Sequence, residues 1–199
     1  MKRIIYFAVA AIILASCTSK SQNTMSENQT LDVIMTRVSV RHFTSQKPTD
    51  EQINTLLRAA MAAPTAMNKQ PWGFLVVDDP AILQQIGEQF PNSHVQDGAQ
   101  IAIVPCGDLT KAIEGEGQTY WIQDVSAAVE NLLLAAHSMG LGAVWTGLTP
   151  ITARAQQASE LLGLPEHIVP LCIIPVGYPA EQPQMKDKYI ESNIHYNVW

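Results

Sequence analysis

The stretch Arg37-Val38-Ser39-Val40-Arg41-His42-Phe43 places two cations and a hydroxyl within five positions of the chain. It overlaps the end of a segment in which apolar residues recur at helical spacing, at positions 31, 34, 35 and 38. A first helix is therefore expected to close in this basic run. Cations suit the carboxyl end of a helix because they oppose its macrodipole. Alone, the run fits a solvated helix end as well as it fits an anion site.

Three further stretches are each weak evidence for a ligand site. Residues 63–72 offer backbone donors, an amide and an aromatic ring between two prolines, which is also typical of a rigid connection. Residues 140–147 place glycines around a short apolar strand, where backbone could approach a planar ligand closely or where a helix could simply stop. Lys186-Asp187-Lys188 is by default a solvated charged stretch.

The hydrophobic periodicity predicts one domain in which helices and strands interleave. A capping box of Thr49 and Gln52 begins the second helix, and Pro170 and Pro175 place the last strand near a sheet edge or at a bulge. The segment 119–139 is apolar on almost all sides, so part of its burial is expected to come from a second subunit. The expected helices cover about residues 31–38, 50–60, 80–90, 119–139 and 152–162, and the expected strands 74–77, 99–106, 143–146 and 168–176.

The first sixteen residues are typical of a secretory signal, because Lys2 and Arg3 precede an apolar run that ends in small residues. That run is shorter than the roughly 20 apolar residues of a transmembrane helix. The sequence Leu14-Ala15-Ser16-Cys17 resembles the lipobox of bacterial lipoproteins, which implies cleavage before Cys17, its lipidation, and anchoring at the cell envelope on the periplasmic face. An ordinary signal with an incidental cysteine, or a chain that stays in the cytoplasm with Cys17 unmodified, are the alternatives. Residues 17–30 are predicted to be a flexible tether, and 31–199 the domain.

Charge and cysteine content exclude some classes of protein. The net charge of −6 argues against a nucleic-acid binder, whose footprint is a basic surface. Cys106 and Cys172 lie in apolar, strand-like runs, where free buried thiols are expected, although a disulfide is an alternative. The cysteines and the five scattered histidines have no metal-ligand spacing.

Taken together and in this order, the stretches closely resemble the nitroreductase family. The resemblance covers about residues 31–199 and adds Gly177-Tyr178-Pro179 to the segments above. Its most specific pieces are Ser39 with Arg41, and the loop Asn68-Lys69-Gln70-Pro71-Trp72. It implies an α+β fold of three layers, α/β/α, around a mixed or antiparallel sheet. It also implies a homodimer with FMN at the subunit interface and ping-pong transfer from NAD(P)H through flavin N5 to a nitro, quinone or similar acceptor.

The resemblance also assigns residues to the cofactor. The flavin phosphate would be held by Arg37, Ser39, Lys186 and Lys188, and Val38 would be among the residues that contact the cofactor. Arg41 would reach toward the ribityl chain and the isoalloxazine. The other subunit's loop would contribute Pro64, Thr65 and Asn68, and the flavin would lie along Trp145, Thr146 and Gly147. Val38, Thr65 and Lys188 depart from the family's commoner residues, but lysine still binds phosphate as a point charge.

No catalytic side chain is expected, because hydride transfer to N5 needs neither a side-chain acid nor a nucleophile. Substrate choice is expected to depend on residues 90–121 acting as a lid, with Tyr120 and Trp121 facing the flavin or packing in the core. His42, beside the basic run, is the histidine to test. The competing hypothesis is a flavin-binding lipoprotein that is non-catalytic or driven by another donor, because NAD(P)H is a cytoplasmic compound.

Overall fold

The computed structural model describes residues 28–199, so the predicted signal and Cys17 lie outside the residues described here. The helices and strands interleave along the chain, as the periodicity predicts. The helices are α1 (Gln29–Thr36), α2 (Asp50–Met61), α3 (Pro80–Gln89), α4 (Tyr120–Ser138) and α5 (Thr152–Leu162). The strands are β1 (Trp72–Val77), β2 (Ile101–Asp108), β3 (Gly142–Ala143), β4 (Thr146–Gly147), β5 (Ile168–Pro170) and β6 (Cys172–Gly177). Four 3₁₀ turns are η1 (Ala66–Asn68), η2 (Pro91–Ser93), η3 (Gly115–Thr119) and η4 (Glu191–Asn193).

The sheet has the order β1-β2-β6-β3, and every strand pairing is antiparallel. β5 continues the ladder with β2, but its register is offset by one residue from that of β6. The extra residue makes a bulge near Leu171, as the prolines predict. The strand is nevertheless central, between β2 and β3, so the alternative of an edge position is wrong.

A single strand was expected at residues 143–146, and the structure divides it into β3 and β4. Both pieces pair with β6 in one common register, Gly142 opposite Gly177 and Thr146 opposite Ile173. The gap between them falls opposite Pro175, which has no N–H to donate. The ladder is therefore interrupted at Val144 and Trp145.

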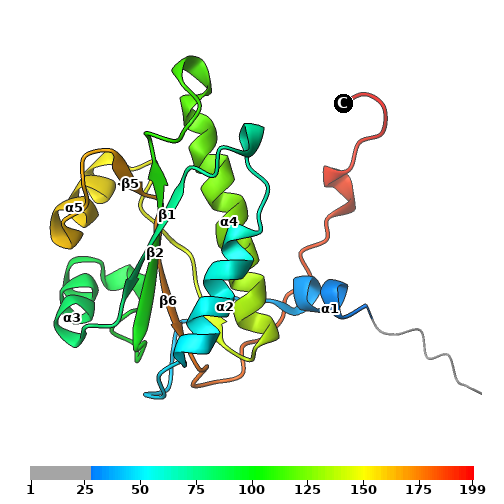
Figure 1. Cartoon of the computed structure of the whole chain (residues 1–199). Helices are drawn as coiled ribbons and strands as arrows, with labels where there is room; N and C mark the ends of the chain where they lie inside the picture. The colour runs from blue at the N-terminus through cyan, green and yellow to red at the C-terminus, as the bar shows by residue number, and fades with distance from the viewer. Residues whose placement is uncertain (1–27) are drawn as a thin grey trace, which may run out of the picture.

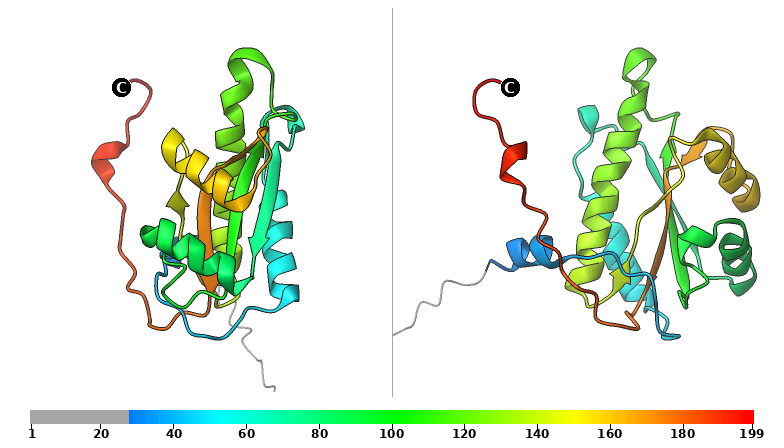
Figure 2. Two further views of the ribbon diagram at one scale, coloured as in Figure 1. Left: turned by 90° about the vertical axis from the view of Figure 1, so that its left-hand side faces the viewer. Right: turned by 180° about the vertical axis from the view of Figure 1, so that it is seen from behind.

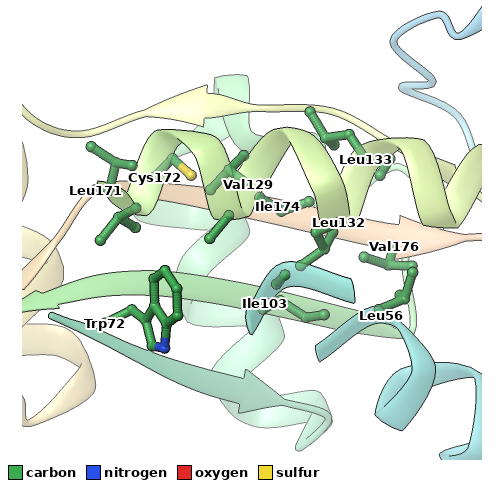
Figure 3. Packing of buried hydrophobic residues seen from close by; sticks show 14 of the residues in the cluster. Leu56, Trp72, Ile103, Val129, Leu132, Leu133, Leu171, Cys172, Ile174 and Val176 are labelled. Carbon is green, nitrogen blue, oxygen red and sulfur yellow. The ribbon is translucent and has the colours of Figure 1, made fainter. Parts of the chain in front are cut away.

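The domain has three layers (Figure 1): α2 and α4 cover one face of the sheet, and α3 and α5 cover the other. Both faces of β2 are buried, with Ile101 and Ile103 in one apolar cluster and Ala102 and Val104 in the other. This explains its unbroken apolar sequence. Figure 3 shows the first cluster, in which Val129 and Leu132 of α4 pack over β2 and β6.

The two cysteines lie on opposite faces of the sheet, Cys172 in the cluster under α4 and Cys106 in the cluster under α3 and α5. Both thiols are free and buried. This agrees with the expectation of free thiols. Burial raises the pKa of Cys106 to about 12 and raises that of Cys172 well above its ordinary value.

The two ends of the described chain leave apolar side chains uncovered. α1 ends at Thr36, earlier than expected, so Val38 and the basic run follow the helix instead of closing it. Its apolar residues Leu31, Ile34 and Met35 are exposed. Figures 1 and 2 show the tail after Lys188 running away from the three layers. Within the described residues of one protomer, these apolar side chains of α1 and of the tail stay exposed.

Candidate cofactor site

The two basic clusters, more than 140 positions apart in sequence, line one cavity of about 550 Å³. Arg37 and Arg41 line it from the segment after α1, and Lys186 and Lys188 from the tail. Ser39 supplies a hydroxyl to the same wall. Four cations therefore face a space large enough for a small-molecule ligand.

The clusters converge because residues 42–44 pair with residues 178–180. The N–H of Thr44 donates to the carbonyl of Tyr178 at 2.9 Å, and the N–H of Ala180 donates to the carbonyl of His42 at 3.0 Å. Residues 37–43 are also fixed to β3, since the N–H of Val40 donates to the carbonyl of Ala143 at 3.0 Å. The chain beyond Ala180 therefore returns along the segment that carries the arginines.

This docking requires a glycine at position 142. A Cβ built on Gly142 would lie 2.6 Å from the Cβ of Val40, closer than packed carbon atoms come. The glycine of the 140–147 stretch therefore serves close approach of two backbones. Gly142 thereby lets the basic segment pack directly against β3.

Glu130 of α4 is the one acidic residue among those that line the cavity, and no motif in the sequence indicates it. Its Oε1 lies 3.3 Å from Nε of Arg37, whose side chain is only 17% exposed. The ion pair orients Arg37 while leaving a clear excess of positive charge in the cavity. The signal in the sequence was weak, because Glu130 is one of two acids in a mostly apolar helix.

Trp145, Thr146 and Gly147 do not line this cavity in the single protomer. Thr146 and Gly147 form β4, and the Thr146 hydroxyl donates to the carbonyl of Asn92 at 3.2 Å. Trp145 is half-buried between β3 and β4. The sequence therefore identified a structured segment, and its relation to a ligand is a prediction.

None of residues 63–70 lines the basic cavity in the same protomer. The N–H of Ala66 donates to Asp124 near the start of α4, at 2.8 Å. By contrast, Thr36, just before the basic run, contacts His137 near the end of α4. Glu130, which pairs with Arg37 at the cavity, is six positions beyond Asp124 on α4, a rise of about 9 Å. Pro64, Thr65 and Asn68 are thus not brought to Arg37 and Arg41 within one copy of the chain.

The structure corrects the expected lid and decides between the two alternatives for Trp121. Residues 90–121 cannot move as one lid because they contain β2, the fully buried central strand. Trp121 is a core residue: a Cβ on Gly107 would lie 2.3 Å from its ring. Most residues of the segment between β2 and α4 are exposed, and the side chain of Tyr120 is exposed too. His42 belongs to the paired segment 42–44 and is exposed.

Two kinds of feature are absent from residues 28–199. No cluster of three or more His, Cys, Asp or Glu there could hold a metal ion. None of the helices in that range is both long enough and apolar enough to span a membrane.

Comparison with known proteins identifies relatives along the domain. The model described as the nitroreductase family matches residues 34–93 and 88–178. A protein of Methanothermobacter thermautotrophicus with the name "Putative NADH dehydrogenase/NAD(P)H nitroreductase" is 40% identical over 176 residues, covering 88% of this chain and 90% of its own. Residues 1–18 match a model described as a prokaryotic membrane lipoprotein lipid attachment site.

Solved structures show the same architecture. A Parabacteroides distasonis protein with the same name as the Methanothermobacter relative has a TM-score of 0.82 at 44% identity, covering 87% of this chain and 100% of its own. An FMN-dependent nitroreductase of Clostridium difficile has a TM-score of 0.76 at 25% identity, covering 85% and 99%. The predicted fold is confirmed.

Proposed function

Because the chain belongs to the nitroreductase family, we propose that it is an FMN-dependent oxidoreductase that passes electrons from NAD(P)H to a nitro, quinone or similar acceptor. The observation that carries the proposal is the cavity in which four cations from both ends of the domain meet. FMN would supply the chemistry, accepting a hydride at N5 and releasing the electrons to the second substrate.

The residues of the cavity fit the phosphate of FMN. A phosphate monoester carries nearly two negative charges at neutral pH, and the cavity offers four cations against the single carboxylate of Glu130. Arg37, Ser39, Lys186 and Lys188 would hold the phosphate, with Val38 in the same wall. Arg41 would extend toward the ribityl chain and the ring, and a cation there favours the anionic reduced flavin.

The rest of the proposed site requires a second copy of the chain. In a single protomer Asn68 does not line the cavity to which Arg41 belongs, and the family resemblance takes this loop from the other subunit. In a homodimer the loop of one protomer would meet the basic cavity of the other. Trp145, Thr146 and Gly147 would lie along the ring, where they orient it and limit the approach of water.

The uncovered apolar side chains support this dimer. The exposed apolar residues of α1 lie next to the cavity, and Ile34 and Met35 help to line it. The tail adds more exposed large apolar side chains, at positions 189, 190, 194, 196, 198 and 199. Burying such side chains against another protein surface is favourable because it removes apolar area from water. A partner protomer would cover both segments.

The match at residues 1–18 favours a second proposal, lipid anchoring at Cys17 with the domain on the periplasmic face. The match also supports the alternative of a flavin-binding lipoprotein that is non-catalytic or driven by another donor. An exported domain would be separated from NAD(P)H, which is made in the cytoplasm. Whether the protein is an NAD(P)H-driven enzyme or a flavin-binding lipoprotein, the cavity would hold FMN.

The spectrum of the purified protein separates these functions. Bound oxidised FMN gives a yellow protein, and anaerobic NADH or NADPH should bleach it, with colour returning on addition of a quinone. Colour that neither nucleotide bleaches would favour the alternative. A protein that stays colourless after incubation with FMN would refute both.

A further inference from the structure

The loop between α2 and β1 is held in an unusual backbone conformation. Met67, Asn68 and Gln70 have φ values of 52°, 55° and 49°. Asparagine tolerates this left-handed region, but methionine and glutamine rarely adopt it. Such conformations persist only where surrounding contacts fix them, and they cluster at functional sites.

Contacts inside the loop supply part of that constraint. The N–H of Gln70 donates to the Thr65 hydroxyl at 3.1 Å, and the Gln70 amide donates to Oδ1 of Asn68 at 3.0 Å. The N–H of Asn68 donates to the carbonyl of Thr65 at 3.1 Å. These bonds close the loop on itself, but they do not fix it to the domain.

Asp124 makes the connection to the domain. Its side chain is only 6% exposed, and Oδ1 accepts the N–H of Ala66 at 2.8 Å, at the start of η1. The other buried positions of α4 are apolar. A buried carboxylate in this setting is unfavourable unless it is hydrogen-bonded, and its partner is the strained loop and not the helix. The aspartate therefore fixes where the loop stands on α4.

We infer that Asp124 is a positioning residue for FMN, which it serves by holding the loop that offers Pro64, Thr65 and Asn68 to the partner's flavin. The inference rests on the proposed function. Asp124 itself contacts the loop and not the cofactor. Its effect is exerted in trans: Asp124 of one protomer shapes the flavin site whose basic cavity belongs to the other.

Three substitutions test the positioning role through the dissociation constant of FMN, measured by fluorescence titration of the apo-dimer. Asp124→Ala removes the acceptor and should weaken binding about tenfold or more, since a buried N–H is left unpaired. Asp124→Asn keeps an oxygen at the same place and should bind within about threefold of the unmodified protein. Asp124→Leu, which has the same branching at Cγ but no acceptor, serves if the alanine protein does not fold.

Asn131→Ala is the matched control. Asn131 also ties α4 to the neighbouring α2 region, donating to the carbonyl of Ala59 at 3.1 Å, but it does not touch the loop. Its removal should lower the melting temperature while leaving FMN affinity unchanged. Equal losses of affinity in Asn131→Ala and Asp124→Ala would mean that Asp124 is merely structural and would overturn the inference.

A mixed dimer tests the action in trans. One protomer carries Arg41→Ala and the other Asp124→Ala, with different affinity tags so that only the mixed dimer is purified. If Asp124 acts across the interface, one of the two sites contains both defects and the other contains neither. The mixed dimer should then bind one FMN with unaltered affinity.

If Asp124 acts within its own protomer, each site has one defect and no tight site remains, which overturns the inference. Asp124→Ala homodimers that bind FMN as tightly as the unmodified protein also overturn it, although the proposed function then stands. A failure of the unmodified protein itself to bind FMN overturns both.

Discussion

Replacing Arg37 by alanine should weaken FMN binding by about ten- to a hundredfold. Its side chain is 17% exposed, so its bond to a phosphate would be only partly screened by water. Hydrogen bonds to charged groups contribute about 1.5–3 kcal/mol, and each 1.4 kcal/mol is a factor of about ten. Lys188 is exposed, so Lys188→Ala should cost about 1 kcal/mol or less, as for exposed ion pairs.

Glu130 adds to the loss when Arg37 is removed. Its carboxylate is left in the cavity without the guanidinium that lies 3.3 Å away, and it then repels the phosphate. Adding Glu130→Gln to Arg37→Ala should therefore restore part of the affinity. The double variant separates the lost attraction from the repulsion that replaces it.

Riboflavin, which has the same ring and ribityl chain without the phosphate, is the control ligand. The apo-protein is titrated with each flavin, and flavin fluorescence is followed at low and at high salt. Arg37→Ala should lower affinity for FMN and leave affinity for riboflavin unchanged, and the difference should shrink as salt rises. Equal losses for both flavins would refute the assignment of this cavity to the phosphate.

Three other changes probe the fold around the site. Gly142→Ala forces the new Cβ against Val40 and should cost about 1–3 kcal/mol of stability, seen as a lower melting temperature, together with weaker FMN binding; an unchanged melting temperature would contradict this packing. In a Cys17→Ser protein, a thiol reagent at pH 8 should find no reactive group until the chain unfolds, because burial raises the pKa of Cys106 to about 12 and keeps both remaining thiols protonated. Deleting residues 189–199 removes exposed apolar surface and should shift the protein toward monomer in sedimentation, with loss of bound flavin; a stable truncated dimer would show that the tail is dispensable.

Much of the fold could be predicted because its signals are local. The capping box of Thr49 and Gln52 is present with both hydrogen bonds, and α2 begins at Asp50 as expected. Asp79 caps α3 with Pro80 at its first position, and β2 has the continuous apolar sequence of a strand that is buried on both faces. These patterns need no knowledge of the rest of the chain.

The errors came from contacts between distant segments. The interruption between β3 and β4 depends on Pro175 standing opposite it, and the burial of Trp121 depends on its packing against Gly107. The role of Asp124 could not be inferred from its neighbours in sequence, because its partner, Ala66, is 58 positions away. The convergence of the basic clusters came from a resemblance in their order, whereas the structure gives the physical reason, the pairing of residues 42–44 with 178–180.

Lipid anchoring would change which electron acceptors the domain can use. Twelve positions separate Cys17 from Gln29, where α1 begins, and so short a chain spans at most about 40 Å. α1 leads directly into the basic cavity, so two acyl chains at Cys17 would hold the flavin near the bilayer surface. Cleavage before Cys17 removes Lys2 and Arg3 from a chain of net charge −6, and the resulting net charge of −8 would give the domain no attraction of its own for an anionic membrane. We therefore expect the lipidated protein, reconstituted in vesicles, to reduce a bilayer-resident quinone at least about tenfold faster than Cys17→Ser protein added to the same vesicles. Both should reduce a water-soluble quinone at equal rates. Equal rates with the bilayer-resident quinone as well would show that the anchor does not determine which acceptor the flavin meets.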